Sequence, residues 1–328
     1  MTQSVLQNAP RGPLLEADAR QFSGDFNVHS FMFRHNLCGH PLFALPRLAE
    51  LAERMLQRGD NAKFVALGGK SNQVSSEFTA MEPQKRLASA VLDIAAAGAW
   101  MKISSANAVD PEYAALLQQI LQEIEACAAQ PLRQQITWST LTIFLASPGI
   151  VTPYHIDHES NFLFQISGSK HISLFDPNDR QLLPDAQIES FYSGDFQAAK
   201  YREELQARGT TYHLVPGTVI HNPPLGPHWV QNGDEVSVSV SIGFCMRPLD
   251  LRARVYQVNH YLRKAGLGPT PPGRSPLRDG LKIAGIGMLS KSKPTTPDEI
   301  LFSGLQRLAA PPRALKRWMR QLTSSVRR

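Results

Sequence analysis

The sequence is poor in cysteine and has no long apolar stretch. The three cysteines, Cys38, Cys127 and Cys245, are scattered over 328 residues, and no two have the close spacing of a metal-binding pair. An odd number of isolated cysteines argues against a disulfide framework and against a zinc knuckle. No uninterrupted apolar run approaches the roughly 18 residues that a transmembrane helix needs.

Two further signals are missing. The first residues lack the basic and then apolar order of a secretory signal peptide. Residues 68–71 are Gly-Gly-Lys-Ser, but the earlier glycine of a phosphate-binding loop is absent. With the scarce cysteines, these absences predict a cytoplasmic protein in a reducing compartment.

The composition is that of a globular protein. Hydrophobic residues make up 42% and charged residues 19% of the chain, which is enough apolar material for a large core. The chain carries 34 basic against 28 acidic residues, and seven basic but no acidic residues follow Leu301. The net positive charge is therefore a property of the C-terminal tail, and no specific nucleic-acid partner is expected.

The segment Thr152–Asp157 carries the most chemical information. Its sequence predicts extended backbone, and residues two apart on a strand project to the same face, so His155 and Asp157 lie side by side. A third ligand is expected from residues 216–230, where a glycine turn, a short strand and a proline-rich turn lead to His228. Two histidines and one carboxylate form the facial triad of non-haem Fe(II) oxygenases, which leaves coordination positions open.

Two other histidines are rival candidates for the third ligand. His213 lies nearby in the sequence, and His221 ends the expected strand Thr218–His221, where it is equally well explained as a wall residue of a barrel. An isolated His-x-Asp pair is also common on exposed strands. The choice therefore depends on the fold that surrounds the pair.

Short apolar or alternating segments surround the His-x-Asp pair. Residues 141–146, 161–166 and 170–175 each have the length and pattern of a strand, and Ser-Pro-Gly and Ser-Gly-Ser turn signals separate them. Such a series predicts a small β-barrel or jelly roll. The mouth of such a barrel is a usual place for a metal.

In the order and spacing of these motifs, the chain resembles the JmjC-like, cupin-like 2-oxoglutarate oxygenases, in particular the branch that contains the asparaginyl hydroxylase of hypoxia-inducible factor. The resemblance covers residues 141–244, and the motifs that carry it are Thr152-Pro-x-His155-x-Asp157, Asn161-Phe162, Gly168-x-Lys170 and Pro216-Gly up to His228. It implies a mostly β fold with flanking helices, built on a double-stranded β-helix core.

The resemblance also implies roles for individual residues. The iron ligands would be His155, Asp157 and His228. The contacts of 2-oxoglutarate would be Thr152, Asn161, Lys170 and Ser241. Lys170 would bind the distal carboxylate, whereas Ser241 is a departure, because the family has a second asparagine at that place.

Lys170 has a physical interpretation of its own. It opens a strand on which Ile172 and Leu174 share its face, so its ammonium points into an apolar barrel unless an anion meets it. A dicarboxylate is such an anion. The alternative is an edge lysine whose stem packs on the barrel while its head reaches water.

The resemblance implies an Fe(II)- and 2-oxoglutarate-dependent dioxygenase, by default a hydroxylase. A protein, a peptide or a small metabolite would fit the open barrel mouth as substrate, and demethylation follows if the attacked carbon is an N-methyl group. Two other classes stay open. A cupin-type metal enzyme without 2-oxoglutarate would have no need of Lys170, and a non-catalytic cupin-like module could bind or regulate without chemistry.

The chain is expected to fold in four segments: an irregular lead (1–25), an α/β region flanking the barrel (26–135), the catalytic barrel (136–248) and a helical C-terminal region (249–328). Apolar periodicity predicts helices over residues 45–56, 83–97, 111–129 and 250–262, and strands over 27–34, 63–67 and 99–103. Within the long connection of residues 176–212, a short helix is expected over 197–208, together with substrate-specificity residues. Loops are expected over 266–280 and 290–297.

The tail predicts one more amphipathic helix. Apolar residues recur there at helical spacing, and the basic residues lie largely off that stripe; the apolar positions are Leu315, Trp318, Met319, Leu322 and Val326. The resemblance implies a homodimer through C-terminal helices. A tryptophan beside a basic face is also typical of helices that lie on anionic membranes, so peripheral membrane contact is the second expectation.

Overall fold

The computed structural model describes residues 12–57, 65–68, 74, 80–81 and 91–309. The chain divides into two compact units, one of residues 1–184 and 197–247 and the other of residues 185–196 and 248–328. Within the described residues, none of the helices has the length and apolar character that a membrane crossing requires.

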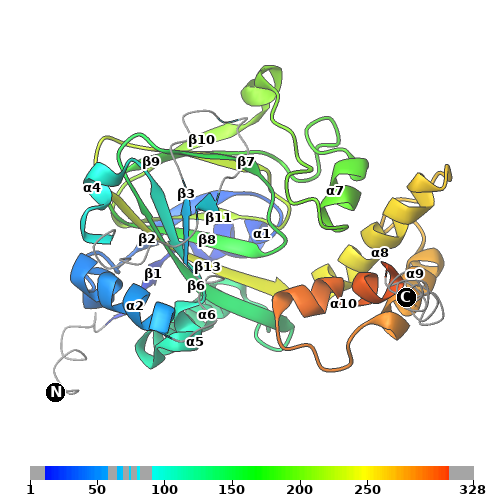
Figure 1. Ribbon diagram of the computed structural model, residues 1–328, viewed down its shortest axis with the longest axis horizontal. Helices are drawn as coiled ribbons and strands as arrows, with labels where there is room; N and C mark the ends of the chain where they lie inside the picture. The colour runs from blue at the N-terminus through cyan, green and yellow to red at the C-terminus, as the bar shows by residue number, and fades with distance from the viewer. Residues whose placement is uncertain (1–11, 58–64, 69–73, 75–79, 82–90, 310–328) are drawn as a thin grey trace, which may run out of the picture. The chain divides into compact units, whose positions relative to one another are not determined.

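The first unit is built on two antiparallel sheets that face each other (Figure 1). The larger sheet has, in spatial order, β1 (Leu15–Glu16), β2 (Phe31–His35), β11 (Thr218–Asn222), β8 (Ser160–Ser167), β13 (Ser237–Met246), β6 (Ile136–Ala146), β5 (Trp100–Ile103), β3 (Val65–Gly68) and β4 (Ala80–Met81). The smaller sheet has β10 (Thr210–Leu214), β9 (Lys170–Leu174), β12 (His228–Asn232) and β7 (Val151–His155).

Alternation along the strands gives the larger sheet two different faces. Phe162 and Phe164 of β8 and Val240 and Phe244 of β13 belong to the main core, which also contains the buried residues of the covering helices. The residues that alternate with them, such as Asn161 and Leu163 on β8, line a cavity on the opposite face. This is the period-two pattern of a sheet with one apolar face and one partly polar face.

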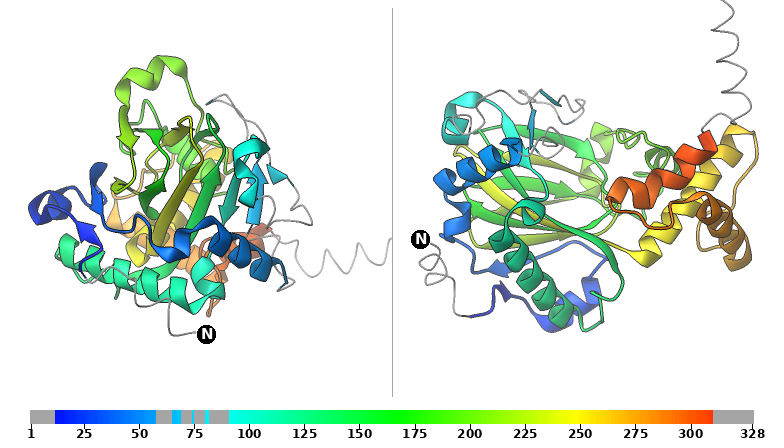
Figure 2. Two further views of the ribbon diagram at one scale, coloured as in Figure 1. Left: turned by 90° about the vertical axis from the view of Figure 1, so that its left-hand side faces the viewer. Right: turned by 60° about the horizontal axis from the view of Figure 1, so that its bottom comes forward.

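Helices cover the apolar face of the larger sheet, and Figure 2 shows α6 lying along it. The covering helices are α1 (Ala19–Asp25), η2 (Pro41–Phe43), α2 (Leu45–Gln57), α4 (Ile94–Ala97), α5 (Ala106–Val109) and α6 (Pro111–Ala128). Asp110 caps α6 by accepting a hydrogen bond from the backbone N–H of Glu112, and it also pairs with Arg47 at 2.6 Å. This cap therefore joins α6 to α2.

The second unit is helical in its described part. It contains α7 (Asp185–Phe191), α9 (Pro276–Leu289), α10 (Pro297–Ala309) and most of α8 (Arg247–Lys264). The buried carboxylate of Glu189 on α7 accepts two hydrogen bonds from the guanidinium of Arg263 on α8, at 2.6 and 2.9 Å. This bidentate pair fixes α7 against α8.

The structure confirms the predicted jelly-roll class and the helices expected over residues 45–56 and 111–129. It corrects the irregular lead, because β1 and α1 lie within residues 1–25. The carboxylate of Glu123 on α6 accepts hydrogen bonds from the N–H groups of Leu14 and Leu15, at 2.8 and 2.9 Å. A long-range contact, which no local pattern reveals, thus holds the lead in place.

Two other expectations need correction. The helix expected over residues 197–208 is only a 3-10 turn, η4 (Glu203–Arg208), in which no residue is buried, so little packing holds a longer helix there. The loop expected over residues 266–280 ends early, since α9 starts at Pro276, a proline in the first turn after Ser275. Most of the helix expected over residues 83–97, and the tail helix, lie outside the described residues.

Candidate metal centre

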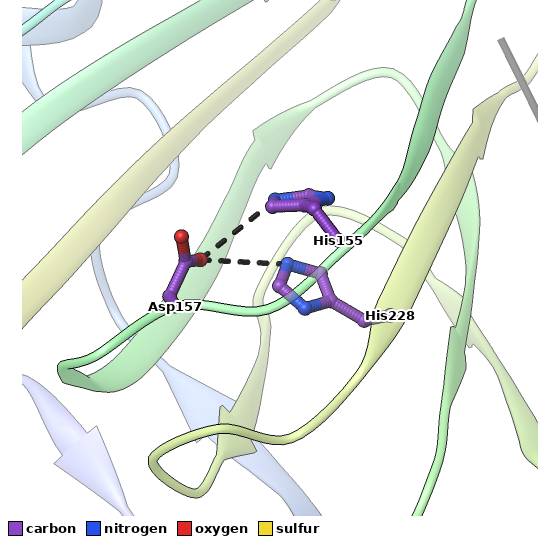
Figure 3. A group of neighbouring side chains, drawn as sticks. All are labelled: His155, Asp157 and His228. Carbon is purple, nitrogen blue, oxygen red and sulfur yellow. Dashed lines mark ion pairs between the residues drawn. The ribbon is translucent and has the colours of Figure 1, made fainter. Parts of the chain in front are cut away.

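Three predicted ligands meet at one end of the cavity between the two sheets, where Asp157 faces both imidazoles (Figure 3). His155 ends β7, His228 begins β12, and the two lie directly opposite each other in the antiparallel pairing. The Oδ2 atom of Asp157 is 3.8 Å from Nε2 of His155 and 3.7 Å from Nε2 of His228. The register of β7 with β12 therefore places His155 and His228 together, and Asp157, two residues after His155, supplies the third ligand.

Hydrogen bonds orient both imidazoles. Nδ1 of His155 lies 2.7 Å from the carbonyl oxygen of Pro153, and Nδ1 of His228 lies 3.0 Å from that of Gly226. A carbonyl only accepts, so each Nδ1 carries the proton, and the lone pair of each Nε2 is directed toward Asp157. This is the usual orientation of histidines that bind a metal through Nε2.

The turn between β11 and β12 supports two of these residues, Asp157 and His228. The N–H of Leu225 donates to the carbonyl oxygen of Asp157 at 2.8 Å, and Leu225 has a positive φ of 63°. Asn222 donates to the carbonyl oxygen of Gly226 at 3.1 Å, and the same oxygen accepts from Nδ1 of His228 at 3.0 Å. The turn thus positions His228 and the backbone of Asp157 together.

The electrostatics favour the protonation states that a divalent cation needs. Burial, together with the neighbouring His155, lowers the pKa of His228 to about 4. Burial alone would raise the pKa of Asp157, but His155, His228 and Lys102 outweigh it and hold that pKa below its ordinary value. Neutral imidazole and ionised carboxylate are the ligand forms that bind a metal, so the residues present fit Fe(II).

The cavity has a volume of about 350 Å³ and opens between the two sheets. All seven residues that the sequence indicates for metal and co-substrate line it: Thr152, His155, Asp157, Asn161, Lys170, His228 and Ser241. Asn161 donates to the hydroxyl of Ser241 at 2.7 Å, so these two side chains are already coupled. The structure therefore brings the complete predicted set to one place.

Lys170 is buried in the wall of this cavity. It is 4% exposed, and no hydrogen bond or ion pair reaches its ammonium from the residues that the structure describes. Burial lowers the pKa of Lys170 to about 7. Asn232 lies opposite it in the β9–β12 pairing, and the Oδ1 atom of Asn232 is buried with no partner among the described residues. A buried, unpaired cation indicates a site for an anion.

The rival histidines lie elsewhere. Both ring nitrogens of His221 are engaged, since Nε2 accepts from the N–H of Asn27 and Nδ1 pairs with the carbonyl oxygen of Asn161, each at 3.0 Å. The ring of His221 stacks on Phe162 in the main core. His213 is exposed on β10 and stacks on His171. The structure thus brings His228, and neither rival, to the other two ligands.

The cavity also contains residues that the sequence did not indicate, namely Trp100, Lys102, Phe144, Glu159, Asn222 and Asn232. Glu159 continues the period-two spacing of His155 and Asp157, so its position could have been recognised. Lys102 and Trp100 gave no signal, because they enter the cavity only through the long-range pairing of β5 with β6. Burial, together with the charge of Asp157, raises the pKa of Glu159 to about 7.

A jelly roll with two histidines and an aspartate at one end of its cavity defines a cupin-like protein with a candidate metal site. Residues 43–249 match the family model described as a cupin-like domain. The chain belongs to this family, which confirms the assignment that the motifs indicate.

Curated relatives match shorter segments. HSPB1-associated protein 1 of Rattus norvegicus is 28% identical over 127 residues, which are 33% of this chain and 26% of that protein. The tRNA wybutosine-synthesizing protein 5 of Mus musculus is 34% identical over 102 residues, which are 30% of this chain and 31% of that protein. The matched segments thus span only about a quarter to a third of these relatives' length.

Solved structures share the fold over most of the chain. The ribosomal oxygenase YcfD of Escherichia coli in complex with cobalt and 2-oxoglutarate has a TM-score of 0.50 and 15% identity, covering 94% of this chain and 71% of that one. The X-ray structure of E. coli ycfD has the same score and identity and covers 93% of this chain. At this identity the likeness establishes the fold.

Proposed function

We propose that this chain is an Fe(II)- and 2-oxoglutarate-dependent oxygenase whose default reaction is hydroxylation. The observation that carries the proposal is Lys170, a buried ammonium in the same cavity as the His155, Asp157 and His228 triad. A metal site alone does not explain a desolvated cation. A dicarboxylate that chelates the metal at one end and meets Lys170 at the other explains both features.

Each part of the chain has a task in this proposal. The triad would hold the metal on one face, and Lys170, with the donors Thr152 and Asn161, would bind and orient the dicarboxylate. Bound iron and 2-oxoglutarate would supply the oxidising chemistry, in which O₂ is reduced, 2-oxoglutarate becomes succinate and carbon dioxide, and a substrate C–H becomes C–OH. The walls of the cavity would exclude water from the oxidant.

The solved oxygenase of similar fold contains cobalt and 2-oxoglutarate, which supports the same pair of ligands here. The curated relatives differ from each other in name, and neither name fixes the substrate of this chain. The substrate class therefore has to be inferred from the size and lining of the cavity. A volume of about 350 Å³ that must also contain the co-substrate leaves room for a side chain or a small metabolite.

The test is spectroscopic. Anaerobic addition of Fe(II) and 2-oxoglutarate to the full chain is expected to give a metal-to-ligand charge-transfer band in the visible range. His155→Ala and His228→Ala are expected to abolish the band, because each removes one ligand. His213→Ala is the matched control, since this exposed histidine lies outside the cavity, and it should leave the band unchanged.

Three results would contradict the proposal in different ways. Metal binding by calorimetry without a band on addition of 2-oxoglutarate would identify a cupin-type enzyme that does not use this co-substrate. Failure to bind metal at all would favour a non-catalytic module. Loss of the band in a His221→Ala variant that stays folded, with the band intact in His228→Ala, would overturn the ligand assignment.

A further inference from the structure

Two charged residues in the cavity are not assigned as ligands of the metal or the co-substrate in the proposed function. Lys102 lies on β5 and Glu159 immediately precedes β8, so they approach the cavity from strands that flank β6 and β13. No ion pair within 4 Å joins them to each other or to another described residue. A cation and an anion that face one small cavity without pairing are available to a ligand.

Packing fixes both charges at the cavity wall. The ammonium of Lys102 lies 5.7 Å from the ring centre of Phe144, the residue directly opposite it on β6. The side chain of Glu159 lies against the bare backbone of Gly243 on β13, where an added Cβ would come within 3.2 Å of its Cγ and Oε1 atoms. These contacts with β6 and β13 hold the two side chains at the cavity wall.

The charges in the cavity indicate what kind of group enters it. A divalent cation, the Asp157 carboxylate, the two carboxylates of 2-oxoglutarate and the Lys170 ammonium together sum to zero. In their ionised forms, Lys102 and Glu159 add one positive and one negative charge, so the loaded cavity is then neutral. A singly charged group would leave an unbalanced charge there, whereas a neutral group with a separated acceptor and donor would satisfy both residues.

We propose that Lys102 and Glu159 form a substrate subsite beside the metal. It takes a group without net charge that presents an anion or hydrogen-bond acceptor to Lys102 and a cation or donor to Glu159. The zwitterionic head of an α-amino acid and a primary carboxamide share this chemistry. The subsite rests on the proposed oxygenase function, and it gives that function a substrate class.

The experiment uses the full chain, Fe(II) and 2-oxoglutarate without oxygen, and four probes with similar apolar chains. Norleucine is the zwitterion, hexanamide the carboxamide, N-acetylnorleucine the anion and norleucinamide the cation. Binding is followed by the perturbation of the charge-transfer band and by calorimetry. One or both neutral probes should bind about ten- to a hundredfold more tightly than either charged probe, as expected for one lost charge-assisted hydrogen bond.

Charge variants make the test specific. Lys102→Gln should shift the preference toward the cationic probe, and Glu159→Gln should shift it toward the anionic probe, each by about tenfold or more. The conservative variants Lys102→Arg and Glu159→Asp should keep the order found in the wild type, which guards against a variant that merely misfolds. Lys200→Gln, at an exposed lysine, is the matched control and should change nothing.

The outcomes separate the subsite from the oxygenase function. A normal charge-transfer band with the same order of probes in the wild type and in both glutamine variants would overturn the subsite alone. The same holds if the band forms and none of the four probes binds. A wild-type protein that binds metal without giving the band would overturn the oxygenase function, and the subsite with it. Opposite shifts in the two glutamine variants would establish the subsite, and the tighter neutral probe would distinguish amino acid from carboxamide.

Discussion

Replacement of Lys170 by methionine is the most direct test of the co-substrate site. Methionine keeps most of the apolar stem and removes the charge, and Ile172 on the same strand provides an apolar neighbour. We expect metal affinity to stay within about threefold, because none of the contacts among the described residues joins Lys170 to the triad. The affinity for 2-oxoglutarate should fall much further.

The size of the loss follows from burial and pKa. Removal of one partner of a buried charge pair typically costs about 3–5 kcal/mol. Since the pKa of Lys170 is about 7, its protonation at pH 7.5 costs the free protein about 1 kcal/mol, which reduces what the charge contributes to binding. The remaining loss is about 2–4 kcal/mol, or roughly 30- to 1,000-fold in the dissociation constant.

Anaerobic calorimetry with 2-oxoglutarate, on protein already loaded with Fe(II), measures this loss. Lys200→Met provides the same replacement at an exposed position and should not alter affinity. A dissociation constant for Lys170→Met within threefold of the wild type would refute the reasoning. Lys170 would then be explained as a buried lysine without an anionic ligand, and an enzyme that does not use 2-oxoglutarate would gain support.

Three further predictions follow from the same contacts. Asn222→Ala should weaken Co(II) binding, followed by absorbance, by about 10- to 100-fold, because this amide supports the turn that orients a metal-ligand imidazole. Binding of 2-oxoglutarate should weaken as pH rises above about 7, by up to about tenfold per pH unit, because the buried Lys170 is then neutral and must take up a proton to meet the dicarboxylate. We also propose that residues 310–328 mediate dimerisation, so truncation after Ala309 should lower the mass measured by light scattering and leave metal binding intact.

Matched controls keep these predictions specific. Asn232→Ala removes another buried amide of the same cavity that does not touch a metal ligand, so it should leave Co(II) affinity unchanged. Lys170→Met should abolish the pH dependence of 2-oxoglutarate binding above pH 7. The truncation has an alternative outcome, in which the mass is unchanged and only the full chain binds anionic vesicles in a salt-sensitive way. This result would indicate that the tail contacts membranes and does not mediate dimerisation.

The free protein has its own dependence on pH, of opposite sign. The pKa of Lys170 is lowered to about 7 by burial, from an ordinary value of 10.5. Between these two values the unfolded chain binds more protons than the folded one, so Lys170 makes the free energy of unfolding rise with pH in that window. As the pH rises above about 7, the stability of the free protein should therefore increase while its affinity for 2-oxoglutarate decreases. The two effects of the Lys170 ammonium can thus be measured separately.

The site could be predicted because its information is local. His155 and Asp157 lie two residues apart on extended backbone, and His228 follows a proline-rich turn at the start of a strand. Helices α2 and α6 could be predicted for a similar reason, since their apolar spacing and the proline at the start of α6 are visible in any short window. Features that depend only on residues close together in the chain can be predicted from a sequence pattern.

Features that depend on distant partners could not be predicted. Lys102 reaches the cavity only because β5 pairs with β6, and β2 enters the sheet by pairing with β11, far away in the sequence. The lead is ordered by the Glu123 carboxylate of α6, for which residues 14 and 15 carry no signal. In α9, glycines and prolines near Pro276 favour a loop by composition, whereas tertiary packing of Ile286 holds a helix.

The metal site is organised before any metal arrives. Backbone carbonyls fix the proton of each imidazole on Nδ1, strand register places His155 opposite His228, and the N–H of Leu225 holds the backbone of Asp157. A site of this kind differs from small zinc domains, whose ligands come together only when the metal folds the chain. Metal should therefore stabilise this fold only by mass action, by about 2.7 kcal/mol at a hundredfold excess over the dissociation constant. The affinity for the metal is higher the less the three side chains must move when the metal binds. For this reason Asn222, whose amide does not touch the metal, is expected to affect that affinity.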